Sequence, residues 1–246
     1  MDSDTIAWLV PSFGNPLALQ AIQNPQNAAL STPSLPLLAS SPPPLLSPLD
    51  NTPYTGPALR LSLSHRPKSH LGLLMGTDPS CDVVLPKLPG ISRRHCHLTF
   101  DAESRLVLRD TSKNGTAVWY DDRSNGDKRD FTWVLSSGAE CGFPDRVGTL
   151  VVDIQTVRFQ VVVNPEAGRA RGYVRRVDDF LMELAGRREA AVAPLFSGRT
   201  AAAGEAGRRG RERGFVKHTV EEEGKGPQTF LWNVARPWDP VIPVYE

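Results

Sequence analysis

The chain has 246 residues, enough for one domain with tails or for two small domains. Hydrophobic residues make up 40% of it and charged residues 22%, which is typical of a protein with a buried core. The net charge of +1 gives no general attraction for polyanions, so we expect no nucleic-acid partner. No stretch of about 18 apolar residues is present, so the sequence predicts no membrane span.

The amino terminus favours a location inside the cell. Asp2 and Asp4 precede the short apolar stretch 6–10, which lacks the basic start and longer apolar run of a secretory signal. We therefore expect the nucleus or the cytoplasm. The 3 cysteines show neither CxxC spacing nor a zinc pattern, so we expect reduced, mostly buried thiols and no metal or cofactor. They are Cys81, Cys96 and Cys141.

Proline marks the first boundary. Of the 22 prolines, half lie between Pro11 and Pro57, including the run 42–44. Proline cannot donate a backbone hydrogen bond, so residues 1–57 are predicted to form a proline-rich, largely disordered leader. Within it, the short apolar segment 4–10 is either an edge strand of the following domain or a frayed terminus.

From residue 58 to residue 164, short segments with alternating apolar residues predict β-strands. Turn residues such as Asp78-Pro79 and Asn114-Gly115 separate them, and no helical pattern intervenes. Many short strands at this spacing predict one all-β sandwich domain over 58–164. The segments are 59–63, 71–75, 83–85, 95–100, 106–108, 116–120, 131–135, 149–154 and 157–163.

Beyond this domain the period changes to three or four residues. The apolar residues Tyr173, Val177, Phe180 and Leu184 predict an amphipathic helix from Gly172 to about residue 185. The rest of 165–214 is rich in Arg, Gly and Ala, which indicates a linker. Its basic run 208–213 is either a disordered linker or a nuclear-import or RNA-contacting segment. Residues 215–246 form a C-terminal tail.

Three motifs carry the functional information. The first is Leu74–Leu85 with Gly76-Thr77, the second is Gly90–His95 with Ser92-Arg93-Arg94-His95, and the third is Leu108–Thr116 with Lys113-Asn114-Gly115. In this order the sequence resembles the forkhead-associated (FHA) domain over about 105 residues, Leu59 to Val163. That family shows a glycine-arginine pair, then Ser-x-x-His, then Asn-Gly. The resemblance implies an FHA-type β-sandwich whose loops bind phosphothreonine peptides.

The chemistry of these residues suits a phosphorylated ligand. A phosphothreonine brings a charge of about −2 and three acceptor oxygens. Ser92 can donate its hydroxyl to a phosphate oxygen, and Arg93 can add positive charge. The amide of Asn114 can bond the backbone of an extended peptide, and Gly115 permits a positive φ in the adjacent turn. We therefore expect a phosphothreonine-containing protein as the partner.

Thr77 departs from the family pattern, which has arginine at this position. Threonine keeps a hydroxyl donor but loses the charge and the two-pronged geometry of a guanidinium. Arg93, Arg94 and Lys113 are the candidates to compensate. The alternatives are that these basic side chains form a solvated loop face, and that the domain is a scaffold that no longer needs phosphate.

His95 and Ser92 also raise the question of a nucleophile pair. Their three-residue spacing on a loop supplies no third orienting group, so we predict no catalytic residue and no enzyme. In the FHA family this histidine braces the binding loops by hydrogen bonding. We expect Gly76, His95 and Gly115 to support the loops, and Thr77, Ser92, Arg93, Lys113 and Asn114 to contact the peptide.

The final segment resembles the start of a kinase lobe. Glu223–Gly226 and Thr229–Val234 look like a glycine-rich loop and its second strand, and the arrangement resembles fungal kinases with an N-terminal FHA domain. The third glycine is missing, Tyr245 stands near the expected lysine, and no His-Arg-Asp or Asp-Phe-Gly motif follows. The tail is thus either a kinase remnant or an unrelated hairpin.

The expected function is phosphorylation-dependent protein–protein interaction in signalling. The alternatives are a non-catalytic regulatory fragment or truncated paralogue of an FHA-containing kinase, and the phosphate-independent scaffold. The sequence gives no indication of the oligomeric state.

Overall fold

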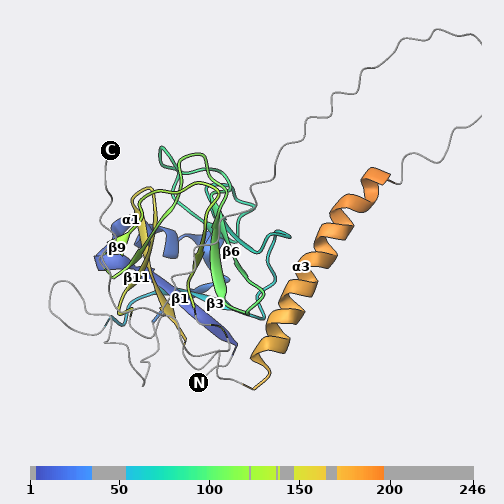
Figure 1. Cartoon of the computed structure of the whole chain (residues 1–246). Coiled ribbons are helices and arrows are strands. Elements are labelled where there is room, and N and C mark those ends of the chain that lie inside the picture. The colour runs from blue at the N-terminus through green and yellow to red at the C-terminus, as the bar shows by residue number, and fades with distance from the viewer. Residues whose placement is uncertain are drawn as a thin grey trace, which may run out of the picture.

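Two β-sheets packed face to face form the body of the protein (Figure 1). The computed structural model describes residues 4–34, 54–121, 123–136, 138, 147–164 and 171–196. The seven-stranded sheet has the order β2-β3-β1-β12-β11-β8-β9, and the five-stranded sheet has the order β10-β7-β6-β4-β5. All named strand pairs are antiparallel except β4 with β5. The predicted all-β sandwich is confirmed.

The strands of the larger sheet are β1 (Thr5–Pro11), β2 (Ser31–Thr32), β3 (Ala58–Ser62), β8 (Ala117–Tyr120), β9 (Arg123–Ser124), β11 (Leu150–Ile154) and β12 (Val157–Val163). Those of the smaller sheet are β4 (Leu73–Gly76), β5 (Val83–Val84), β6 (Cys96–Phe100), β7 (Leu106–Asp110) and β10 (Thr132–Val134). β1, β2 and β9 are the strands that the alternating pattern did not predict.

Alternation along the strands builds the core between the sheets. On β6, Cys96 and Leu98 are buried among the other core residues, as are Leu59 and Leu61 on β3. Phe159 on β12 is fully buried in the same core. Cys81 and Cys96 are free, buried thiols, as expected. Cys141 lies outside the described residues.

The N-terminal segment belongs to the sandwich. β1 lies between β3 and β12, with Ile6 and Leu9 each 2% exposed, so it is neither an edge strand nor a frayed end. This differs from the expectation of a leader over 1–57, of which 1–3 and 35–53 lie outside the described residues. Two of its prolines begin helical turns, Pro16 in α1 (Pro16–Ile22) and Pro25 in η2 (Pro25–Asn27). A first-turn N–H has no helical partner, so proline fits there at no cost.

The side chain of Asn27 ties this segment to the smaller sheet. Its Nδ2 donates to the carbonyl oxygens of Ala21 (2.8 Å) and Val84 (3.0 Å), and its Oδ1 accepts from the Val84 N–H at 2.7 Å. The buried amide thus pairs with edge strand β5 as a neighbouring strand's peptide group would. It fixes β5 at the end of the turn 77–82, which carries one of the three motifs.

Helix α3 (Tyr173–Phe196) packs beside the smaller sheet (Figure 1). Its predicted apolar stripe is buried, and Phe180 meets Phe100 edge to face at 5.4 Å. The helix continues past the predicted end near residue 185. Gly186 costs only about 1 kcal/mol within a helix, and Glu183 and Arg187 form an ion pair of 2.9 Å across it.

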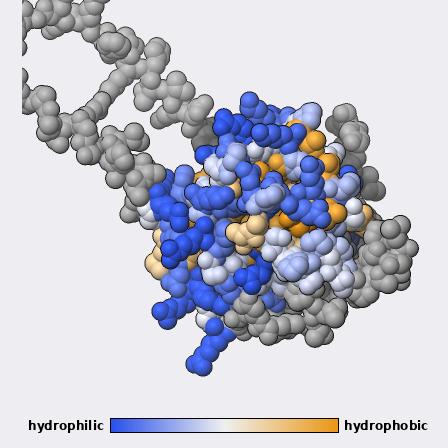
Figure 2. Space-filling view, turned by 180° about the vertical axis from the view of Figure 1, so that it is seen from behind, coloured by the Kyte–Doolittle hydropathy of each residue, from blue (hydrophilic) through white to orange (hydrophobic). Residues whose placement is uncertain are grey.

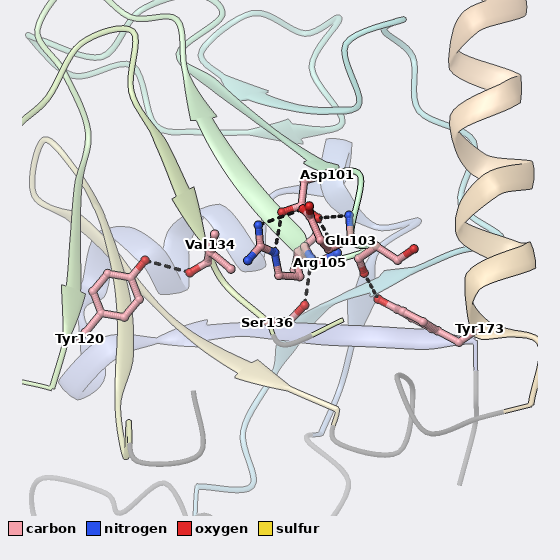
Figure 3. A network of polar contacts seen from close by, with 9 residues as sticks. Asp101, Glu103, Arg105, Tyr120, Val134, Ser136 and Tyr173 are labelled. Carbon is pink, nitrogen blue, oxygen red and sulfur yellow. Dashed lines mark hydrogen bonds and ion pairs between the residues drawn. The ribbon is translucent and has the colours of Figure 1, made fainter. Parts of the chain in front are cut away.

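The start of α3 is fixed to the β6–β7 hairpin (Figure 3). The hydroxyl of Tyr173 donates to the Ser104 carbonyl at 2.9 Å. Within the hairpin, Arg105 donates to Asp101 from Nε (2.6 Å) and from its backbone N–H (2.8 Å). Leu106 N donates to Ser136 Oγ at 2.8 Å, which joins the hairpin to the chain that follows β10. This end of the sandwich lies opposite the three motifs, because β6 and β7 run between them.

Seen from behind, the surface is mainly hydrophilic, with scattered hydrophobic residues (Figure 2). None of the helices that the structure describes is long and apolar enough to cross a membrane. The basic run 208–213 and the kinase-like segments between residues 223 and 245 lie outside the described residues.

Candidate binding site

The three motifs meet at one end of the sandwich, on the loops that follow β4, precede β6 and follow β7. The backbone N–H of Thr77 donates to the Ser92 carbonyl at 3.2 Å. The N–H of Lys113 donates to Ser92 Oγ at 3.2 Å, and Asn114 Nδ2 donates to the Gly90 carbonyl at 2.9 Å. Ser92 therefore stands between the other two loops, and the predicted site residues come together.

Gly76 permits the close approach of the first two loops. A Cβ at this position would lie 2.2 Å from the carbonyl oxygen of Arg93, a distance that no side chain tolerates. With glycine present, the Asp78 N–H also donates to that carbonyl at 3.0 Å. Glycine is therefore required here because the backbone of another loop fills the space.

His95 joins the second and third loops from beneath. Its ring is fully buried; Nδ1 accepts the Ser92 N–H at 3.0 Å, and Nε2 lies 3.1 Å from the Gly115 carbonyl. The first contact requires an unprotonated Nδ1, so Nε2 carries the hydrogen and donates it. Burial lowers the pKa of His95, which keeps the ring neutral. With both nitrogens occupied by backbone groups, His95 cannot act as a base toward the Ser92 hydroxyl.

Gly115 shapes the third loop. Its φ of +91° suits glycine, and a Cβ there would meet the Lys128 backbone nitrogen at 3.0 Å. Its N–H donates to Ser112 Oγ at 2.7 Å, and its carbonyl accepts a second hydrogen bond, of 3.2 Å, from Gln155 Nε2. The turn before β12 thus also contacts the site.

Asp110 is a supporting residue that lies in the third motif and that the sequence analysis gave no role. It is 1% exposed, and its carboxylate accepts hydrogen bonds from Ser112 Oγ (2.8 Å) and Thr116 Oγ1 (2.7 Å). The backbone N–H groups of Ser112 and Asp130 donate to its other oxygen at 3.1 and 3.2 Å. These bonds close the loop 110–116. An Asp followed two residues later by Ser is the local signal that could have indicated it.

The charges at the site divide into a paired and an unpaired set. Arg93, whose side chain is 86% exposed, donates to Asp78 Oδ2 from Nε at 3.0 Å and from its terminal nitrogen at 2.7 Å. Hydrogen bonds from Ser80, and then Arg93, hold the pKa of Asp78 well below its usual range. Arg94 and Lys113 are exposed and form no ion pair with any residue that the structure describes.

No group of three or more His, Cys, Asp or Glu side chains that could hold a metal occurs in the described ranges. Thr77 is half-buried beside Ser92, and His97 is buried on β6. The site offers hydroxyl, amide and cationic groups at a surface, which is suited to binding an anionic ligand.

Comparison with known proteins agrees with the motifs. Residues 73–140 match the family model described as FHA domain, so this part of the chain is an FHA domain. No curated protein matches the sequence.

Several solved structures are similar to the chain. Rad53 1–466 in complex with AMP-PNP is 18% identical over 39% of this chain, which spans 22% of that one (TM-score 0.30). The N-terminal FHA domain of S. cerevisiae Rad53p with a phosphothreonine peptide is 19% identical over 39% of this chain and 71% of its own (TM-score 0.28). The FHA domain of CT664 from Chlamydia trachomatis is 25% identical over 44% and 85%, respectively (TM-score 0.29).

Proposed function

We propose that this FHA domain binds phosphothreonine peptides and thereby mediates phosphorylation-dependent protein–protein interaction in signalling. The observation that supports the proposal is the meeting of the three motifs around Ser92. The solved Rad53p domain holds a phosphothreonine peptide, and we assign the same class of ligand to this chain. The proposed contact residues are Thr77, Ser92, Arg93, Lys113 and Asn114.

Ser92 supplies the central donor to the phosphate. Its Oγ accepts the Lys113 N–H, which leaves the hydroxyl hydrogen for a phosphate oxygen. The loops that meet around it carry three cations, Arg93, Arg94 and Lys113, against the carboxylates of Asp78 and Asp110. The excess of positive charge favours a phosphothreonine, which carries about −2. These cations take the role that the family gives to arginine at the position of Thr77.

Asn114 binds the backbone of the ligand. Its Nδ2 is committed to the Gly90 carbonyl, and its Oδ1 makes no hydrogen bond to a described residue. An exposed amide oxygen held by a fixed Nδ2 is well placed to accept a peptide N–H. This contact recognises an extended chain without selecting its side chains.

The test is a titration of the full chain with a phosphothreonine peptide library and with the same peptides unphosphorylated. We expect binding only to the phosphorylated set, and a loss of about tenfold or more for Ser92→Ala. Ser69→Ala is the matched control, because Ser69 caps a turn before β4, away from the three loops. Equal binding of both peptide sets would reject the proposal and favour the phosphate-independent scaffold.

Thr77→Arg tests the same site through an expected gain in affinity for phosphopeptides. A hydrogen bond to a charged group contributes about 1.5–3 kcal/mol, so restoring the guanidinium should tighten phosphopeptide binding roughly ten- to hundredfold. If neither Thr77→Arg nor Ser92→Ala changes the affinity for phosphopeptides, any ligand binds elsewhere on the domain.

A further inference from the structure

Phe13 is an exposed aromatic residue in an unfavourable backbone conformation. Its side chain is 75% exposed, the highest value among the large hydrophobic residues that the structure describes as exposed. Its φ of 47° and ψ of 39° are left-handed, a region that bulky L residues rarely adopt. Neither burial nor backbone preference explains a phenylalanine here, and strained residues of this kind cluster at ligand-binding sites.

The framework around Phe13 holds this conformation in place. The Asn15 N–H donates to the Ser12 carbonyl at 2.9 Å, which closes the turn η1 (Ser12–Gly14) around Phe13. Asn15 Oδ1 accepts the Ala18 N–H at 2.9 Å and so caps α1. Asn15 Nδ2 donates to the Thr156 carbonyl at 3.0 Å. The turn is therefore fixed on one side by a helix and on the other by the β11–β12 turn.

That second turn is strained as well and reaches the binding loops. Gln155 and Thr156 have φ values of 49° and 80°, which two-residue hairpin turns usually give to Asn and Gly. Gln155 Nε2 donates to the Gly115 carbonyl at 3.2 Å. A Cβ on Gly90 would lie 3.0 Å from Gln155 Oε1 and 3.4 Å from Asn114 Nδ2. A continuous chain of contacts thus leads from Asn114 through Gln155 and Thr156 to the Phe13 turn.

We infer that the peptide-binding surface extends from Asn114 over the β11–β12 turn to Phe13, where the ring contacts an apolar side chain of the ligand. The inference rests on the proposed function, and it names the partner more closely: a phosphothreonine peptide with an apolar residue some distance from the phosphate. An extended peptide advances about 3.3 Å per residue, so one ligand can reach both contact points only with residues several positions apart. Gln155 is a positioning residue, because it fixes the turn between the two contact points.

The decisive variant is Phe13→Gly, because it separates binding from folding. Glycine adopts positive φ without strain, so the melting temperature should rise by about 2–4 °C. Binding should change in the opposite direction, with about a three- to tenfold loss of affinity for phosphopeptides that carry an apolar residue several positions from the phosphothreonine. Affinity for peptides with serine at those positions should stay unchanged.

Met182→Ala is the matched control. Met182 is also exposed, at 63%, but it lies on α3 beside the smaller sheet, whereas η1 contacts β12 of the larger one. We expect it to change no peptide's affinity. If Phe13→Gly leaves every peptide's affinity unchanged while Ser92→Ala abolishes binding, the Phe13 contact is wrong and the proposed function stands. If phosphorylated and unphosphorylated peptides bind alike, both are wrong.

Discussion

The guanidinium of Arg93 donates two hydrogen bonds, of 3.0 and 2.7 Å, to one oxygen of Asp78, although the Arg93 side chain is 86% exposed. Both residues lie at the centre of the candidate site, one on each of two loops joined by backbone hydrogen bonds. The cation best placed to meet a phosphate is thus already paired with a carboxylate. An exposed pair of this kind is weak and exchanges readily with another anion.

Asp78→Asn should therefore strengthen phosphopeptide binding. The substitution keeps the shape and an oxygen acceptor but removes a negative charge that competes with the phosphate for Arg93. We expect the affinity to rise about two- to fivefold at low ionic strength, and this gain to shrink in high salt, where exposed charges are screened. Fluorescence anisotropy at two salt concentrations measures it. Weaker binding by Asp78→Asn would instead mean that the carboxylate orients Arg93 for the ligand.

His95→Ala should lower the stability of the domain as well as its affinity. The substitution leaves the Ser92 N–H without a partner and removes one of the two donors to the Gly115 carbonyl, which keeps Gln155 Nε2. An unpaired buried group costs about 1–3 kcal/mol and a lost hydrogen bond about 0.5–1.5 kcal/mol, so the free energy of unfolding should fall by about 2–4 kcal/mol. Urea denaturation measures this loss. His70→Ala, at an exposed position before β4, should change the free energy by less than about 0.5 kcal/mol.

The sequence predicted the strands of the sandwich better than it predicted the edges of the domain. Alternation on β3, β6, β7 and β12 is a local signal, and the three motifs give the order of the loops. β1 lacks this signal because all of Thr5–Pro11 is buried, on both faces of a central strand. Its proline-rich surroundings favoured a leader, although proline at the first turn of a helix is compatible with order.

Contacts between distant segments explain the rest of what was missed. The Asn27–Val84 pairing joins residues 57 positions apart, and the Gln155–Gly115 contact joins residues 40 apart. The engagement of Arg93 by Asp78 depends likewise on two loops lying side by side, which a linear motif cannot show. The resemblance of the C-terminal segment to a kinase lobe stays a prediction.

Asn27→Ala tests whether the N-terminal segment is part of the folded domain. The substitution removes a buried amide that both donates to and accepts from Val84. The edge strand then loses the partner of one N–H and one carbonyl, and the free energy of unfolding should fall by about 2–4 kcal/mol. Asn24→Ala is the control, since Asn24 caps only the short turn η2 and should cost about 1 kcal/mol or less. Equal effects of the two would argue against the pairing.

His97 makes the stability of the domain depend on pH. Burial on β6, and then the positive charges of Arg109 and His70, lower its pKa from 6.5 to about 4. The unfolded chain therefore binds a proton at a higher pH than the folded one. The stability contributed by the neutral ring is fully present above about pH 6.5 and is lost as the pH falls toward 4.

Urea denaturation between pH 7.5 and 4 should show this loss. A shift of this size corresponds to about 3 kcal/mol across the interval, and His95, whose pKa is also lowered by burial, acts in the same direction. His97→Gln removes the titrating group, so its stability should fall less steeply with pH than that of the wild type, whatever its stability at pH 7.5. Parallel pH profiles for the two proteins would show that His97 does not carry the effect.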